Sequence, residues 1–136
     1  MNNSFHDAYP EYNSSFVQES FYFKFGLVQR DVERYISGKE VLDIGAGNGD
    51  SALLFIKQFN VSRVQSVDPS DLSGIEFYAN TQRLARKDDV ELLHVAADDH
   101  DASDSCSYTD KGLETHMFGN GSETVDSRRI DTIVRQ

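Results

Sequence analysis

The chain contains few residues of the kinds that mark secreted, metal-stapled or membrane proteins. It has 136 residues, with one cysteine, two prolines and no tryptophan. The lone thiol, Cys106, excludes an intrachain disulfide and a cysteine-rich zinc site. No apolar run approaches the roughly 18 residues of a membrane-spanning helix, and the first residues, MNNSFHDAYP, lack the basic start and apolar core of a signal peptide. We therefore expect a cytoplasmic protein without a membrane span.

Positive charge is also scarce. The 13 Lys and Arg residues are outnumbered by 23 Asp and Glu, and the net charge is −10. Nucleic acids and anionic membranes are bound mainly through Lys and Arg, so the composition predicts neither as a partner. Hydrophobic residues make up 38% and charged residues 26%, as in ordinary globular domains, and the length indicates one domain.

Apolar periodicity predicts alternating strands and helices along the first two thirds of the chain. We expect an N-terminal arm over residues 1–13 and a leading helix over 14–38, then strands over 40–45, 63–70 and 89–97, with helices over 50–59 and 71–87. This β-α-β-α-β alternation predicts an α/β fold, with a Rossmann-like parallel sheet, flanking helices and right-handed crossovers. Residues 14–136 are predicted to form one domain with its core at 40–97.

Two parts of this prediction concern particular side chains. On the helix over 71–87, the plausible packing positions are Ile75, Tyr78, Ala79, Leu84 and Ala85. The strand over 89–97 includes a histidine, His94, which we interpret as a core or edge residue rather than a catalytic base.

Residues 98–127 differ in character from what precedes them. They are polar and rich in Ser and Asp, and they predict a polar loop region with a short edge strand around Glu114 to Phe118. The acidic residues between Asp98 and Asp104 lack the spacing of an EF-hand, so we predict no metal site. The following run, RRIDTIV over 128–134, fits either a final strand or the beginning of a helix.

The stretch VLDIGAGNGD, residues 41–50, places Gly45, Gly47 and Gly49 between the first strand and the first helix. Glycines at this point let a ligand approach the backbone and the N–H groups of the helix. A dinucleotide-binding loop has the pattern G-x-G-x-x-G, whose third glycine would fall at position 50. Asp50 stands there instead, an acid where a pyrophosphate would sit. A nicotinamide-dependent oxidoreductase is therefore disfavoured.

The pattern that is present, D-x-G-x-G-x-G from Asp43 to Gly49, resembles the first motif of class I S-adenosylmethionine-dependent methyltransferases. The resemblance implies that this loop lies under the methionine part and the sugar of S-adenosyl-L-methionine. Gly45, Ala46 and Gly47 would allow close backbone approach, and Asp43 would orient the amino-acid end. The cofactor carries an ammonium and a sulfonium but no phosphate, so a nearby carboxylate is favourable.

An acid after the second strand supports this interpretation. Asp68 can accept hydrogen bonds from both ribose hydroxyls, and the run Asp68-Pro69-Ser70 resembles the family's second motif. At the end of the third predicted strand, Ala97 and Asp98 lie where the family contacts the adenine. Asp98 either accepts from the exocyclic amine or simply begins the acidic loop.

The order of segments further resembles the FkbM-like subgroup of methyltransferases over residues 40–134. The matching segments are DIGAGNGDSALLF, VDPS, GIEFYANTQRLA, LLHVAADDHDAS, GNGSETVDS and RRIDTIV. The chain departs from the subgroup by Asp68-Pro69 in place of Glu-Pro. The subgroup also continues into a further strand with an Asp-x-Glu-Gly segment after the last run. The resemblance thus implies a fold that is incomplete relative to a full methyltransferase, with a sheet edge open to an oligomer or a partner chain.

The resemblance implies methyl transfer, through in-line displacement, to a hydroxyl of a sugar or another small-molecule acceptor. The catalytic base is not identified; Asp98 and His100 are the nearest candidates by position. The alternative hypothesis is a truncated, catalytically silent cofactor-fold module that acts by protein interaction.

Overall fold

A computed structural model describes residues 34–57, 59–111, 116–117 and 121–135. The predicted arm over 1–13 and most of the helix predicted over 14–38 lie outside the described residues, although residues 34–36 are helical.

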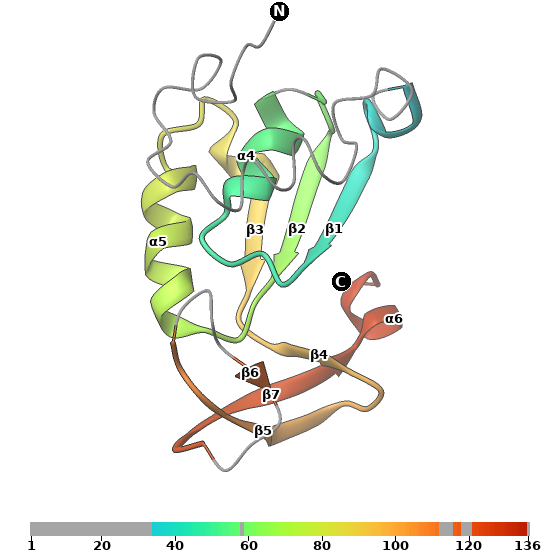
Figure 1. Ribbon diagram of the computed structural model, residues 1–136. Helices are drawn as coiled ribbons and strands as arrows, with labels where there is room; N and C mark the ends of the chain where they lie inside the picture. The colour runs from blue at the N-terminus through green and yellow to red at the C-terminus, as the bar shows by residue number, and fades with distance from the viewer. Residues whose placement is uncertain (1–33, 58, 112–115, 118–120, 136) are drawn as a thin grey trace, which may run out of the picture.

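A parallel sheet of three strands, in the order β1-β2-β3, forms the first layer of the described part of the chain (Figure 1). Its strands are β1 (Glu40–Ile44), β2 (Arg63–Val67) and β3 (Val90–Leu93). Helix α4 (Asp50–Lys57) connects β1 to β2, and α5 (Asp71–Thr81) with the short 3-10 helix η2 (Lys87–Asp89) leads to β3. The predicted α/β class and its β-α-β-α-β order are confirmed.

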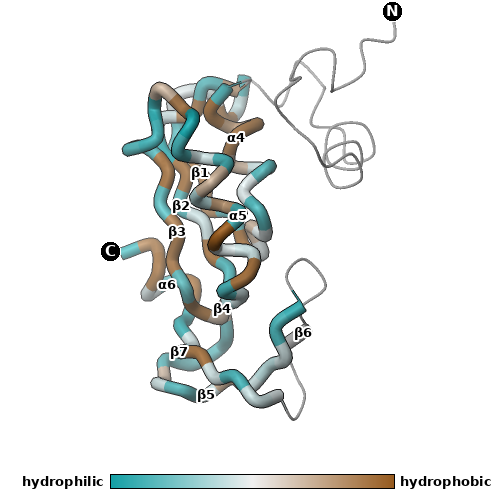
Figure 2. The backbone as a smooth tube through the Cα atoms, turned by 90° about the vertical axis from the view of Figure 1, so that its left-hand side faces the viewer, coloured by the Kyte–Doolittle hydropathy of each residue, from teal (hydrophilic) through white to brown (hydrophobic). Residues whose placement is uncertain are grey.

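Helices α4 and α5 lie on one face of this sheet, and the short helix α6 (Ile130–Ile133) lies on the other face (Figure 2). The core between α4, α5 and the sheet is apolar. Its buried members are Ala46, Ala52, Leu53, Leu54, Ile56, Phe59, Val61, Val64, Phe77 and Leu84. Each large aliphatic or aromatic side chain buried in this way contributes about 1.5–3 kcal/mol to folding. One member of the cluster, Ala46, belongs to the glycine-rich turn itself, so the turn is packed onto this core.

The predicted packing face of α5 is wrong. Of the predicted positions Leu84 is buried, whereas Ile75, Tyr78, Ala79 and Ala85 are exposed. The helix instead buries Ser73, Phe77 and Thr81, which lie four residues apart on one face. Small polar side chains on this face allow α5 to approach its neighbours, and Phe77 supplies the apolar contact.

The predicted polar loop over 98–127 is wrong for most of its length, because most of that region is a second sheet. Its strands, in the spatial order β4-β7-β5-β6, are β4 (Ala96–Asp98), β7 (Glu123–Arg129), β5 (Ala102–Thr109) and β6 (His116–Met117). The short edge strand predicted around Glu114 to Phe118 is present as the edge strand His116–Met117. The strand predicted over 89–97 is therefore divided into β3 and β4, which belong to different sheets. The run 128–134 contains both predicted alternatives, since β7 ends at Arg129 and α6 follows.

Polar contacts hold much of this second sheet together. Its buried core is small and consists of Ala96, Tyr108 and Val125. Strands β5 and β7 pair antiparallel, with a register irregularity between Ala102 and Cys106. The hydroxyl of Ser105, within that irregularity, donates to the hydroxyl of the fully buried Ser127 at 2.7 Å.

The carboxyl ends of β1 and β2 point toward the second sheet (Figure 1). One residue, Asp110 after β5, connects the two layers: its carboxylate accepts from the Ser70 hydroxyl at 2.6 Å and from the Leu72 amide at 3.0 Å. Both donors belong to the beginning of α5. In the described part of the chain, no helix combines the length and apolarity needed to cross a membrane.

Candidate functional site

The glycine-rich turn adopts a backbone that glycine favours at each of its three positions. Gly45, Gly47 and Gly49 have φ angles of +79°, +52° and +81°. At Gly45 an added Cβ would meet no atom of the described residues within 4 Å, so the space above it is open. At Gly49 it would lie 2.7 Å from a ring carbon of Phe77. The turn is thus open toward the outside at Gly45 and tightly packed at Gly49.

Asp68 holds this turn against the end of β2. One of its carboxylate oxygens accepts from the Gly47 amide at 2.9 Å, and the other accepts from the Ser70 amide at 2.9 Å. The Gly45 amide adds a backbone bond to the Val67 carbonyl at 2.8 Å. The predicted residues at the ends of β1 and β2 therefore lie together. Each Asp68 oxygen still has a free lone pair for a further donor.

Asp43 lies near the carboxyl end of β1 and is also buried. Its carboxylate accepts from the Ser51 hydroxyl at 2.5 Å. Burial raises the pKa of Asp43 above its usual value, and the charge of Asp68 adds to this, while the hydrogen bond from Ser51 opposes it.

Asp50, the first residue of α4, is a third buried acid beside the turn. One oxygen accepts from the Ser51 amide at 2.8 Å, and the other oxygen has no hydrogen-bond partner among the described residues. Burial, with help from the charge of Asp43, raises the pKa of Asp50 to about 6. The Asp50 amide donates to the side chain of Asn48 at 3.3 Å. The sequence predicts Asp50 at the beginning of the helix over 50–59 and as a residue that disfavours a pyrophosphate, but it does not predict the burial of this carboxylate.

The end of the third strand differs from the prediction. Because β3 ends at Leu93, the next residue at the carboxyl edge is His94, which lies within the predicted strand but outside the observed one. The Nε2 atom of His94 lies 2.6 Å from the Pro69 carbonyl oxygen. Ala97 and Asp98 belong instead to β4 and pair with β7. The assignment of these two residues to the adenine stays a prediction.

Asp98, Asp99 and His100 form a partly exposed group at the end of β4 and just after it. Their donor atoms all lie within 4.8 Å of one another. His100 is hydrogen-bonded to Asp99 at 2.8 Å, which raises the pKa of His100, and the charge of Asp98 adds to this effect. The thiol of Cys106 lies 3.5 Å from the Asp98 carboxylate, and burial first, then this contact, raises the pKa of the thiol. A raised thiol pKa is the opposite of what a nucleophilic cysteine needs.

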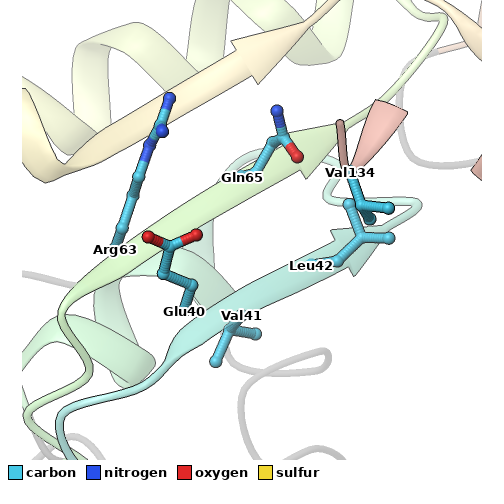
Figure 3. A pocket seen from close by; sticks show the side chains of 6 residues that line it. All are labelled: Glu40, Val41, Leu42, Arg63, Gln65 and Val134. Carbon is cyan, nitrogen blue, oxygen red and sulfur yellow. The ribbon is translucent and has the colours of Figure 1, made fainter. Parts of the chain in front are cut away.

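A small depression lies on the sheet face opposite α4 and is not part of this site. Figure 3 shows its lining side chains, which come from β1, β2 and the end of α6: Glu40, Val41, Leu42, Arg63, Gln65 and Val134. Its volume of about 150 Å³ is below the range of about 300–1,000 Å³ that is usual for small-molecule pockets. It contains none of the predicted site residues.

Comparison with known proteins finds a likeness of fold to solved structures. No family model matches the chain, and no curated protein matches it by sequence. Among solved structures, the methyltransferase FkbM from Methylobacillus flagellatus KT aligns with a TM-score of 0.52 and 19% identity, over 85% of this chain and 27% of that chain. The chain has a methyltransferase fold. It spans less than a third of the length of the methyltransferase that it matches.

A second similar structure is a provisionally assigned sarcosine dimethylglycine methyltransferase from Galdieria sulphuraria. It aligns with a TM-score of 0.45 and 15% identity, over 58% of this chain and 29% of that chain.

The residues at the turn leave room and hydrogen-bond acceptors for a ligand. The open space at Gly45 admits a ligand close to the backbone, and the remaining lone pairs of Asp68 can accept from hydroxyl groups. All these groups lie at the carboxyl edge of a parallel sheet, where open α/β folds place their ligands.

Proposed function

We propose that the chain binds S-adenosyl-L-methionine and serves as the cofactor-binding part of a methyltransferase. The observation that carries this proposal is the bond from the Gly47 amide to Asp68, which joins the glycine turn of β1 to the acid after β2. In this proposal Asp43, Gly45, Ala46, Gly47 and Gly49 contact the methionine part of the cofactor.

At the second strand end, Asp68 and Pro69 face the ribose. Ala97 and Asp98, which lie in β4, would supply the adenine contacts that the sequence resemblance implies. The cofactor supplies an electrophilic methyl group, and the chain's own residues bind and orient it. The methyl acceptor that the sequence resemblance implies is a hydroxyl group of a sugar or of another small molecule. We propose that the protein functions in the cytoplasm, where a free cysteine such as Cys106 stays reduced.

Isothermal titration calorimetry with S-adenosylmethionine and S-adenosylhomocysteine tests the cofactor. We expect binding by the wild-type chain and a loss of about tenfold or more in affinity for Asp68→Asn, because one acceptor of ribose hydroxyls becomes an amide donor. The matched control is Asp88→Asn, which removes an exposed acid at η2, beside the opposite end of β3. Wild-type chain that is folded by circular dichroism and binds neither compound would refute the proposal.

A second candidate function rests on the free edge of β1. In the described residues, β1 pairs only with β2, so its other edge is open to a strand from another chain. A catalytically silent module would use this edge for protein interaction. Light scattering after gel filtration, together with the calorimetry, separates the two functions: a stable oligomer without cofactor binding favours the silent module.

A further inference from the structure

The two residues that follow β2, Asp68 and Pro69, are held by the residues at the end of β3. The Asp68 amide donates to the Leu93 carbonyl at 3.2 Å, and the Nε2 atom of His94 lies 2.6 Å from the Pro69 carbonyl oxygen. Two consecutive residues after β2 are thus bonded to the last residue of β3 and to the residue after it. We refer to these two hydrogen bonds as the β2–β3 clamp.

The backbone turns sharply at His94. The Val95 amide donates to the Leu93 carbonyl at 3.0 Å, which closes a three-residue turn with His94 at its centre. His94 does not have a positive φ, so the turn is of the inverse γ kind that is common at strand ends. The same Leu93 carbonyl accepts from the Asp68 amide. The turn that carries the imidazole is therefore tied to the residue whose neighbour it contacts.

The imidazole is the donor in its contact with Pro69. A carbonyl oxygen can only accept a hydrogen bond, so Nε2 carries the hydrogen. The first backbone bond of α5 runs from the Gly74 amide to the Ser70 carbonyl, one residue beyond Pro69. Among the described residues, the His94 imidazole is thus the donor that satisfies the Pro69 carbonyl. A second contact of Nε2, at 3.3 Å from the exposed Asp71 carboxylate, adds little because water screens it.

The clamp controls the orientation of the Asp68 side chain. The two oxygens of Asp68 accept from the Gly47 and Ser70 amides, and each oxygen keeps one lone pair. Pro69 joins Asp68 to Ser70, so a displacement of Pro69 changes the angle at which the carboxylate is held. Hydrogen bonds weaken steeply as they depart from their preferred angle. A carboxylate that is to accept from ribose hydroxyls must therefore be fixed on this side as well.

We propose, building on the proposed function, that His94 is a positioning residue that fixes Asp68 for the ribose hydroxyls of the cofactor. The imidazole acts through the Pro69 carbonyl and does not itself contact the ligand. The His94 side chain is 44% exposed. Its replacement leaves no cavity in the apolar core, so it affects binding more than folding.

Three substitutions at His94 separate the hydrogen-bond donor from the ring. A glutamine side chain is long enough to place its amide nitrogen where Nε2 lies, so His94→Gln keeps a donor for Pro69. An asparagine has the same amide group on a shorter side chain, so His94→Asn does not reach the carbonyl. His94→Phe keeps a ring without a donor. The first variant should preserve the clamp, and the other two should break it.

Calorimetry on the full chain with S-adenosylhomocysteine and its 2′-deoxyribose analogue tests this inference. The ratio of the two affinities reports the ribose hydroxyl that the analogue lacks. For the wild-type chain we expect a ratio of about tenfold, as a hydrogen bond to a charged group typically gives. The ratio should fall to about threefold or less in His94→Asn and His94→Phe and stay about tenfold in His94→Gln. Urea unfolding checks that each variant is folded.

Three results overturn the inference while leaving the proposed function in place. One is a loss of affinity in His94→Phe and His94→Asn that is equal for both ligands, as a merely structural role would produce. Another is a ratio near one in the wild-type chain, and the third is a ratio for His94→Gln as low as that for His94→Asn. Absence of binding by both ligands to the folded wild-type chain is a different result, which refutes the proposed function itself.

Discussion

At the scale of single residues, the buried acids around the glycine turn impose a stability cost. Asp50 is 5% exposed and lacks a partner for one oxygen among the described residues. An ionised carboxylate in that position is poorly solvated, so the folded state holds a proton more tightly than the unfolded chain does. Natural sites retain such a group when binding requires it.

This cost leads to a pH-dependent prediction. The pKa of Asp50 is about 6 in the folded chain, above its ordinary value of 3.8. The folded state therefore binds more protons between these values, and stability falls as pH rises from about 4 through 6. We expect Asp50→Asn to stabilise the chain by about 1–3 kcal/mol at pH 7.5 and by much less at pH 4, measured by urea unfolding. An equal difference at both pH values would contradict this account.

The glycines of the turn allow a second test at this scale. Gly45 and Gly49 have nearly the same positive φ, but an added Cβ at Gly49 would lie 2.7 Å from the Phe77 ring. Gly45→Ala introduces backbone strain of about 1–2 kcal/mol, whereas Gly49→Ala adds overpacking of about 1–3 kcal/mol. Thermal or urea unfolding should show the larger loss for Gly49→Ala. Phe77→Leu should recover part of it if the ring causes the clash, and equal losses at the two glycines would exclude that cause.

At the scale of elements, the buried face of α5 determines which side chain packs against the glycine-rich turn. Phe77 is 1% exposed and Ile75 is 69% exposed on the same helix. The hydrophobic residues of α5 lie on two faces of the helix. From apolar spacing alone, the face that is exposed to solvent was predicted to be the packing face. What selects the buried side is the fit of one ring against a glycine that belongs to another element.

A matched pair of substitutions measures this choice. Phe77→Ala removes a fully buried ring and should cost about 3–5 kcal/mol, because it leaves a cavity between α4 and α5. Ile75→Ala should change stability by no more than about 0.5 kcal/mol, since its side chain is mostly in water. Urea unfolding of both variants checks the prediction. A large loss at Ile75 would indicate that this side of α5 is covered in solution.

At the scale of the whole molecule, Asp110 couples the two sheets. It follows β5 yet accepts from the Ser70 hydroxyl and the Leu72 amide at the beginning of α5. Ser70 also caps α5 by accepting from the Ser73 amide. Through Asp110, the second sheet thus helps to hold the beginning of α5 in position. Because α5 follows Asp68 closely in the chain, this link also helps to position Asp68.

Removal of the Asp110 carboxylate should affect the beginning of α5, which is far from Asp110 in the sequence. Asp110→Ala is expected to cost about 1–2 kcal/mol and to accelerate hydrogen exchange at the Leu72 amide, because α5 loses an acceptor at its first turn. Asp88→Ala, which removes an exposed acid at η2, serves as the control. Unchanged exchange at Leu72 would show that the two sheets are not coupled through Asp110.

The sequence by itself determined the parts that depend on neighbours along the chain. Apolar periodicity predicted β1, α4, β2, α5 and β3 in order, and the three glycines predicted the turn between β1 and α4. These features are local: a strand, a tight turn and a helix start are each specified by a few consecutive residues. The meeting of Asp68 with the glycine turn followed, because parallel strands end at one edge.

Only the tertiary structure decided what depends on residues far apart in the sequence. The second sheet has little apolar signal, and it forms because β5 and β7 pair and exchange polar contacts such as Ser105 with Ser127. The end of β3 at Leu93, which brings His94 to Pro69, depends on pairing with β2. Burial of Asp50 likewise requires the packed turn. Non-local pairing and burial are properties of the assembled fold, so no short segment could have shown them.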